Sequence, residues 1–230
     1  MSPDSSFKIH RIALSNVSCF LVYRTGSAML VDCGNRGSER KILSEMEQLG
    51  LAPEMLDLLV LTHVHYDHAG SAAKLRALTG CRILLNEKDA PRLAAGRTPF
   101  PRGTRWKARI VVGLGRIFAW GILRFPPVEA DILSGPETDL AQHGFEGQFY
   151  HLPGHTPGSS ILLLPGGTLL GGDSFFGLPG KRHFPPFAED LEALKKSWMR
   201  LSDLDFHTIF PAHGQPVSRN EFLEELKAQS

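Results

Sequence analysis

Four potential metal ligands lie close together in one stretch of the sequence, VLTHVHYDHAG at residues 60–70. An apolar run ends at Thr62, and His63, His65, Asp67 and His68 follow. Residues two apart in extended backbone point to the same side, so His63 and His65 can bind one cation together. Asp67 and His68 follow where the chain is expected to turn into a helix, and they would face a neighbouring position. One short loop could therefore serve two metal ions, and neither ion would be complete, because catalytic zinc takes about three protein ligands.

Three further residues of ligand type follow apolar segments later in the chain. His155 lies in HLPGHTPGSS, Asp173 in LLGGDSFF and His213 in TIFPAHGQP, each beside Gly or Pro. Layered α/β proteins tend to place their sites at strand ends on one edge of the sheet. The simplest assignment gives one metal His63, His65 and His155, gives the second metal Asp67, His68 and His213, and lets Asp173 bridge both.

A solvated polar loop is one alternative interpretation of the first cluster, and a structural zinc site is another. Four suitable residue types at usable spacing rarely coincide in a polar loop. Structural zinc favours closed shells rich in cysteine, whereas this set has no cysteine and includes carboxylates. The pattern therefore favours an open, catalytic centre.

The segments around these residues alternate between strand and helix patterns. Residues 7–33 predict paired strands, and LDLLVLT at 56–62 predicts a strand buried on both faces. Residues 38–50 space their apolar side chains on one helical face and end at a glycine. The second half offers short strands after 148, a helix at about 188–203, and a last helix that begins with a capping box. A layered α/β domain is the expected class.

The motifs HxHxDH, GHTPG, GD and PAHG, in this order, resemble those of the metallo-β-lactamase superfamily over nearly the whole chain. The resemblance implies a single domain over residues 1–230 with a four-layer αββα sandwich. Asp173 and the wording GHTPGS and GDS are most similar to hydroxyacylglutathione hydrolase (glyoxalase II) and its relatives. Asp32, which ends a strand in LVDCG, is by this resemblance an acceptor that orients a ligand histidine, although a turn residue is the alternative.

The resemblance also implies an activity. Two divalent metal ions, with zinc expected and iron or manganese also suited to His and carboxylate ligands, would hold a hydroxide that attacks an ester, thioester or lactone. Asp67 would act as the catalytic residue by orienting this nucleophile. The alternatives are an iron-dependent persulfide dioxygenase, a phosphodiesterase or ribonuclease on the same centre, and a sensor that keeps the fold without catalysis.

One departure from glyoxalase II concerns the segment after His213. It predicts one short helix and contains no counterpart of the helical extension that holds glutathione in that family. A glutathione thioester is therefore not the expected substrate.

A basic and aromatic insert at about residues 88–130 interrupts the pattern. Between Asp89 and Glu129 it contains eight basic residues and no acidic one. One interpretation is a lid over an anionic or amphiphilic small-molecule substrate, formed by Trp106, Arg116 and Trp120 with His183 nearby. An ordinary helical excursion, a homodimer contact and a segment that rests weakly on a membrane surface stay open.

Net charge, cysteine content and apolar segments limit the possible partners and the cellular location of the protein. The net charge of +1 over 230 residues argues against nucleic acid as a partner. Cys19, Cys33 and Cys81 are odd in number and form no CxxC pair, which indicates reduced thiols. The start has no secretory signal, and the longest apolar tract, 110–125, contains an arginine and is shorter than the roughly 20 residues that span a bilayer. We expect a cytoplasmic protein without an integral membrane segment.

Overall fold

The computed structural model of the chain describes residues 7–98, 123–178 and 183–228. Its strands form two sheets of six, each made from one half of the chain. The first sheet has the order β1 (Lys8–Ala13), β2 (Ser18–Arg24), β3 (Ser27–Val31), β4 (Leu56–Val60), β5 (Arg82–Asn86) and β6 (Ile132–Ser134). The second has the order β12 (Val217–Ser218), β11 (Thr208–Gly214), β10 (Thr168–Gly177), β9 (Ser160–Leu164), β8 (Gln148–His151) and β7 (Glu137–Asp139).

Both sheets are mixed. Strands β3 to β6 run parallel, and β1 and β2 join them as antiparallel neighbours. In the second sheet β10 and β11 are parallel, and the other pairs are antiparallel. The parallel strands therefore end at common edges, where side chains from several strands can meet.

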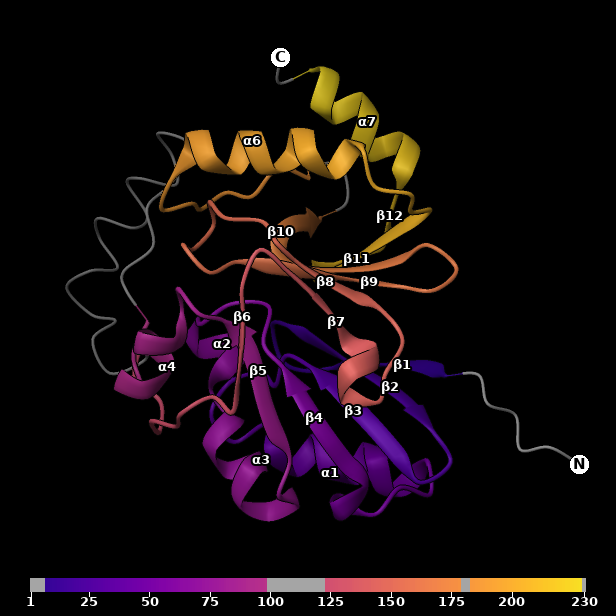
Figure 1. Cartoon of the computed structure of the whole chain (residues 1–230), viewed down its shortest axis with the longest axis vertical. Helices are drawn as coiled ribbons and strands as arrows, with labels where there is room; N and C mark the ends of the chain where they lie inside the picture. Colours follow the sequence, from indigo (N-terminus) through magenta and orange to yellow (C-terminus); the bar gives the residue numbers. More distant parts are fainter. Residues whose placement is uncertain (1–6, 99–122, 179–182, 229–230) are drawn as a thin grey trace, which may run out of the picture.

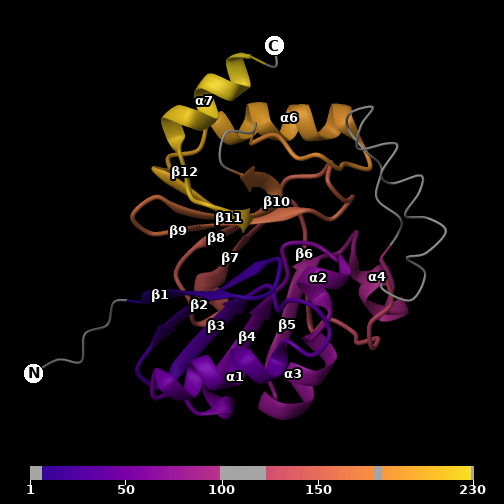
Figure 2. The ribbon, with the colours of Figure 1, turned by 180° about the vertical axis from the view of Figure 1, so that it is seen from behind.

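Helices cover the outer face of each sheet (Figures 1 and 2). The first sheet is covered by α1 (Glu39–Gln48) and α3 (Ala72–Thr79), and the second by α6 (Leu191–Ser202) and α7 (Arg219–Lys227). The shorter helices are η1 (Pro53–Met55), α2 (Tyr66–Ala69), α4 (Ala90–Ala95) and η2 (Leu140–His143). The predicted four-layer αββα arrangement is confirmed, and α7 begins with the predicted capping box of Ser218 and Glu221.

Three apolar cores fill the spaces between these four layers. Strand β4 shows how one segment serves two of them. Leu59 packs in the core that contains α1 and α3, whereas Leu58 and Val60 pack in the core between the sheets, beside Phe149. Each such buried side chain contributes about 1.5–3 kcal/mol relative to exposure. From Leu58 to Val60 the sequence of β4 is apolar on both faces for this reason, whereas Asp57 is exposed.

The insert is described only at its two ends. Helix α4 lies in its first part, and Phe125 in its last part is buried in the core beneath α1 and α3. Trp106, Arg116 and Trp120, the residues predicted for a lid, lie outside the described residues. Within the described ranges, no helix has both the length and the apolar character needed to cross a bilayer. Cys19, Cys33 and Cys81 are free and buried.

Candidate metal centre

The first four predicted ligands lie just beyond the end of β4. That strand ends at Val60, and the following loop carries His63 and His65. Asp67 and His68 lie in the short helix α2, into which the chain turns after this loop, as the sequence predicts. His65 is extended (φ −114°, ψ 159°), so the loop keeps its alternating side-chain directions up to the start of the helix.

The other three predicted ligands come from the second sheet. His155 lies in the loop between β8 and β9. Asp173 and His213 lie inside β10 and β11, and not after these strands as the sequence predicted. The reason is that β10 continues through two irregularities in its pairing with β11 and ends only at Gly177. These irregularities let a strand that is otherwise apolar turn Asp173 toward the cluster.

The seven side chains fall into two neighbouring groups. The potential ligand atoms within each group lie within 4.8 Å of one another, and the groups are His63, His65, His155 and Asp173, and then Asp67, His68 and His213. Asp173 also contacts the second group. Its Oδ2 lies 3.5 Å from Nε2 of His155, and its Oδ1 lies 3.1 Å from Nε2 of His68 and 3.2 Å from Nε2 of His213. Asp173 thus occupies the position that a bridging ligand would need.

Four buried polar atoms in this cluster lack a hydrogen-bond partner. They are Nε2 of His63, His65 and His68, together with Oδ1 of Asp173. Nε2 of His68 and Oδ1 of Asp173 are close, but their orientation is not that of a hydrogen bond. Buried polar atoms are nearly always paired, so four unpaired atoms at one place need an explanation. Imidazole nitrogens and a carboxylate oxygen are ligands for zinc and related cations, and the donor set fits such ions.

The opposite nitrogen of several rings is held by the protein. Nδ1 donates to a fixed oxygen in His68 (Asp32 Oδ2, 2.8 Å), His155 (Phe187 carbonyl, 2.9 Å) and His213 (Asn16 carbonyl, 2.6 Å). Donation from Nδ1 leaves the lone pair on Nε2, which is the nitrogen that faces the cluster. Metal-binding histidines are commonly fixed in this way.

Asp32 connects two of the histidines. Its Oδ1 accepts the backbone N–H of Thr62 at 2.8 Å, and its Oδ2 accepts the Thr62 hydroxyl at 2.8 Å. Because that hydroxyl proton is used, Nδ1 of His63 donates to Thr62 Oγ1 at 3.1 Å. Asp32 therefore orients His68 directly and His63 through Thr62. It is the one described non-glycine residue with positive φ, 59°, a strained conformation that places its carboxylate between the two loops.

The turn between β1 and β2 supplies a residue that the sequence did not single out. Nδ2 of Asn16 lies 3.4 Å from Oδ2 of Asp67, and the carbonyl of Asn16 accepts the ring N–H of His213. An asparagine in a hairpin turn is ordinary, so the local sequence carries no signal of this role. Tertiary contacts bring the turn to the cluster, since Asp67 and His213 lie 51 and 197 residues away from Asn16 in sequence.

His183, which was predicted to lie near the substrate, contacts Phe176, and Phe176 in turn contacts the cluster. Its Nδ1 donates to the carbonyl of Phe176 at 3.0 Å, and the Phe176 ring stacks on His213 with ring centroids 5.1 Å apart. The His183 ring is thus engaged by the backbone, and the Phe176 ring forms the contact with the candidate centre.

The pKa values of the buried histidines are shifted in opposite directions. Burial, followed by the neighbouring histidines, lowers the pKa of His63 well below 6.5, and burial with His155 does the same for His65. Burial also lowers the pKa of His68, but Asp173 and Asp32 raise it more, to well above 6.5. Burial and Asp173 oppose each other in the same way at His213, with a raised pKa as the result. Asp173 therefore favours the protonated form of both the His68 and the His213 ring in the metal-free protein.

The pKa of Asp173 follows from the same pairs. Burial raises it, but His213 and His68 lower it more, to well below its ordinary value of 3.8. A metal cation needs deprotonated ligands, so its binding would displace the protons of His68 and His213. The cluster is thus built to hold positive charge next to Asp173, either as protons or as a cation.

Comparison with known proteins decides the family. The family model of the metallo-beta-lactamase superfamily matches residues 13–213. The chain belongs to this superfamily. A relative named beta-lactamase-like protein 2 homolog, from Drosophila melanogaster, is 26% identical over 92% of the chain, and the chain spans 64% of that protein's length.

Relatives named hydroxyacylglutathione hydrolase confirm the predicted likeness to the glyoxalase II branch of the superfamily. The protein from Cereibacter sphaeroides is 29% identical over 94% of the chain and 70% of its own length. The protein from Haemophilus influenzae, hydroxyacylglutathione hydrolase GloC, is 29% identical over 86% of the chain and 87% of its own length.

Solved structures confirm the predicted fold class. A subclass B3 metallo-beta-lactamase of Bradyrhizobium japonicum matches 97% of the chain and 88% of its own chain, with a TM-score of 0.70 at 17% identity. A beta-lactamase from Chitinophaga pinensis matches 97% of the chain and 89% of its own, with a TM-score of 0.69 at 21% identity. At such identities the likeness establishes the metallo-β-lactamase fold alone.

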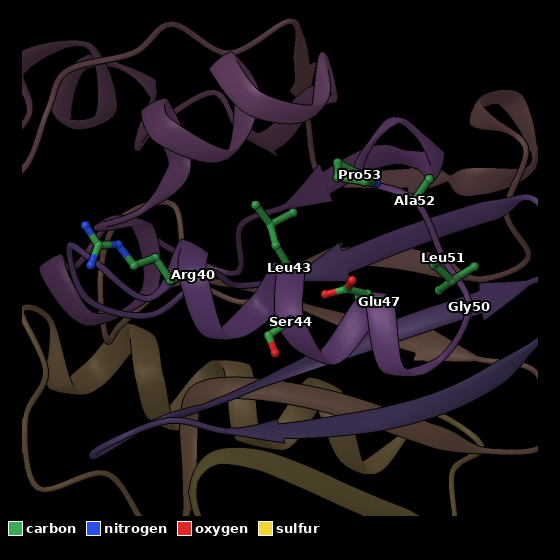
Figure 3. A pocket seen from close by; sticks show the side chains of 8 residues that line it. All are labelled: Arg40, Leu43, Ser44, Glu47, Gly50, Leu51, Ala52 and Pro53. Carbon is green, nitrogen blue, oxygen red and sulfur yellow. The ribbon is translucent and has the colours of Figure 1, made fainter.

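A surface pocket beside α1 is separate from the cluster of seven candidate ligands (Figure 3). It is lined by Arg40, Leu43, Ser44, Glu47, Gly50, Leu51, Ala52 and Pro53, which belong to α1 and the segment that follows it. None of the seven cluster residues lines it, and its charged groups are one arginine and one glutamate. The metal-ligand chemistry of the described residues therefore belongs to the cluster and not to this pocket.

Proposed function

We propose that this protein is a metal-dependent hydrolase that cleaves an ester, a thioester or a lactone. The observation that carries the proposal is the set of four buried, unpartnered atoms of His63, His65, His68 and Asp173 at one place. Two divalent cations there, zinc by expectation and iron or manganese by ligand type, would lower the pKa of a water and supply hydroxide near neutral pH.

The division of ligands follows the two groups of side chains. His63, His65 and His155 would hold one cation, Asp67, His68 and His213 the other, and Asp173 would touch both. The close approach of Asp173 to His155 on one side and to His68 on the other supports this division. The fixed Nδ1 protons of three of these rings support it as well, since they leave Nε2 available.

Asp67 is the proposed catalytic residue. Its Oδ2 lies 3.6 Å from Nε2 of His213 and within reach of the Asn16 amide. A carboxylate held in this way can accept a hydrogen bond from the attacking oxygen and fix its direction. His68 and His213 would release their protons when the centre is loaded, and Asp173, whose pKa lies well below 3.8, would serve as a ligand. Asp67 is therefore the group proposed to orient the attacking oxygen.

The relatives bear on the choice of substrate. The expectation against a glutathione thioester rested on the short segment after His213. The Haemophilus influenzae relative is named a hydroxyacylglutathione hydrolase and is nevertheless matched over 87% of its length. Hydroxyacylglutathione thioesters therefore belong in the substrate screen beside simple esters and lactones.

The test joins metal quantification to a screen of chromogenic esters, thioesters, lactones and phosphodiesters. We expect about two equivalents of divalent metal per chain and turnover of a carbonyl substrate that a chelator abolishes. One equivalent of iron with oxygen consumption would contradict the proposal and favour a persulfide dioxygenase. Turnover restricted to phosphodiesters would also contradict it and favour a nuclease.

Replacing His63 or Asp67 with Ala should remove metal-dependent turnover, because each change deletes a ligand of the proposed centre. We expect activity to fall by about three orders of magnitude or more, with an unchanged far-UV circular dichroism spectrum. His207→Ala is the matched control, since His207 is an exposed histidine outside the cluster. Wild-type activity in either ligand variant would contradict the assignment.

A further inference from the structure

Asp89 is a fully buried carboxylate, 0% exposed, that links a loop of the first sheet to a loop of the second. Its Oδ2 accepts the backbone N–H of Val64 at 2.9 Å and the hydroxyl of Thr156 at 2.7 Å. Its Oδ1 accepts the backbone N–H of Gly158 at 3.0 Å. Hydrogen bonds to an ionised acceptor are roughly twice as strong as those between neutral groups. Three of them from two separate loops make a strong connection.

The groups that donate to Asp89 lie next to the candidate metal ligands in the sequence. Val64 lies between His63 and His65, and Thr156 directly follows His155. His65 and His155 are 90 residues apart in sequence, yet Nδ1 of His65 lies 3.0 Å from Nε2 of His155. The distance between these two ligand loops is set by tertiary contacts, and Asp89 contacts both loops.

A simpler role for Asp89 would be to cap α4. It occupies the N-cap position of that helix, where an aspartate usually accepts an N–H from the first turn. Here the side chain makes no capping bond, and Pro91 in the first turn has no N–H to donate. The carboxylate is directed to the two loops instead of to its own helix.

The loop that carries His155 approaches Asp89 as closely as its backbone allows. A Cβ at Gly158 would lie 2.6 Å from Cγ of Asp89, so a larger residue would push the loop away. Thr156 is held at the same time by Ser159, whose Oγ accepts the Thr156 N–H at 2.8 Å. The geometry of this turn and the contact with Asp89 are therefore formed together.

A second connection from α4 reaches the same loop. Arg92, with Nη1 3.7 Å from Oδ1 of Asp89, forms two hydrogen bonds to Glu189, at 2.6 and 2.8 Å. The backbone N–H of Glu189 donates to the carbonyl of Gly154 at 2.9 Å. The start of α4 thus holds the His155 loop at both of its sides.

We propose that Asp89 is a positioning residue that sets the separation between the loop of His63 and His65 and the loop of His155, and thereby the affinity of the centre for metal. The inference rests on the proposed metal centre and deepens it. Asp89 is not one of the seven cluster residues, and it acts through Val64, Thr156 and Gly158, which are neighbours of the candidate ligands in the two loops.

The test replaces Asp89 with Asn, which keeps the size of the side chain. An amide presents N–H donors to a site that already contains three donors, so at least one hydrogen bond is lost and a donor faces a donor. We expect the zinc affinity of the full chain, measured by competition with a chromophoric chelator, to fall about 10- to 100-fold. In the metal-free protein, amide hydrogen exchange at Val64 and Gly158 should become faster.

Asp131→Asn is the matched control. Asp131 also accepts a backbone N–H, from Ile83 at 2.9 Å, and also pairs with an arginine, Arg76, at 2.7 Å. It contacts neither ligand loop, so its replacement should leave zinc affinity unchanged. Thr156→Val is a milder second variant that removes one donor to Asp89 and should lower zinc affinity about fivefold.

Wild-type affinity and wild-type loop exchange in Asp89→Asn would overturn the inference. Equal losses of affinity in Asp89→Asn and Asp131→Asn would overturn it too, since general destabilisation would then explain both. If Asp89→Asn does not fold, Thr156→Val decides, and an unchanged affinity there overturns the inference. Turnover plays no part in these readouts: inactivity of the wild type overturns the hydrolase proposal, whereas hydrolysis with unchanged variant affinities overturns the role of Asp89 alone.

Discussion

His68 shows how a single buried side chain is prepared for its chemistry. One ring nitrogen donates to Asp32 and the other lies against Asp173, with the ring fully buried. The two carboxylates raise the pKa of the ring when no cation is present, and the hydrogen bond to Asp32 keeps the ring in its orientation when the Nε2 proton leaves. His63 differs because burial and the neighbouring histidines lower the pKa of its ring well below 6.5, which favours the neutral form. Two neighbouring rings of the same residue type thus have pKa values shifted in opposite directions.

This difference predicts how the stability of the metal-free protein depends on pH. His63 and His65 have folded-state pKa values below 6.5, so the unfolded chain binds more protons and stability falls as the pH decreases below that value. His68 and His213 have folded-state pKa values above 6.5, so their contribution is full below 6.5 and is lost as the pH rises through those values. The free energy of unfolding should therefore peak near pH 6.5.

Urea denaturation of the chelator-treated protein across about pH 5 to 9 measures this profile. In His68→Gln the decrease on the alkaline side should become smaller, because one of the two raised groups is removed. A free energy of unfolding that rises steadily to pH 9 would contradict the assigned charge states.

At the scale of the elements, β10 and the loop after β4 must approach each other closely. A Cβ at Gly172 would lie 2.5 Å from Oγ1 of Thr62, the residue that connects Asp32 to His63. Gly172 also has a φ of 50°, where glycine is favoured. The glycine lets β10 bend against this loop, and the same bend brings Asp173 to the cluster.

Gly172→Ala should therefore lower the free energy of unfolding and disturb the centre. Gly166→Ala is the matched control, because Gly166 has a φ of 76° but no atom within 4 Å of its would-be Cβ. Both variants strain the backbone, and the clash with Thr62 should cost Gly172→Ala about 1–3 kcal/mol more. Chemical denaturation measures the difference, and equal losses in the two variants would show that the contact with Thr62 is unimportant.

At the scale of the whole molecule, the candidate centre joins two halves that each have their own outer core. His63, His65, Asp67 and His68 belong to the first half, and His155, Asp173 and His213 belong to the second. The inner core between the sheets holds the halves together by apolar packing. A cation shared by side chains from both halves would add a second link, and metal binding would then be coupled to folding.

We therefore expect zinc to raise the melting temperature and a chelator to lower it. A ligand at 100 times its dissociation constant stabilises the folded state by about 2.7 kcal/mol. Differential scanning calorimetry with zinc and with chelator measures the shift for the wild type and for His207→Ala, which should respond alike. The shift should be much smaller in His63→Ala, and a wild-type melting temperature that ignores zinc would contradict a metal link between the halves.

Local patterns in the sequence were sufficient to predict which residues cluster in the candidate centre, and to predict most of the helices and strands. The spacing of His63, His65, Asp67 and His68 is a property of one short loop, and the two-sided apolar character of β4 is visible along its own length. The family resemblance extended this to the αββα layers and to the role of Asp32. These features are readable because they depend on neighbours in the sequence.

The contacts that position the ligands were decided only by the tertiary structure. No role was predicted from the sequence for Asp89 or Asn16, and Asp173 was expected after a strand that in fact continues past it. Their partners lie 25 to 69 residues away for Asp89 and up to 197 residues away for Asn16. The contact with Val64 depends on packing within the first half, and the contacts with Gly158 and His213 depend on how the two sheets pack against each other. A local pattern of residues does not determine either kind of packing.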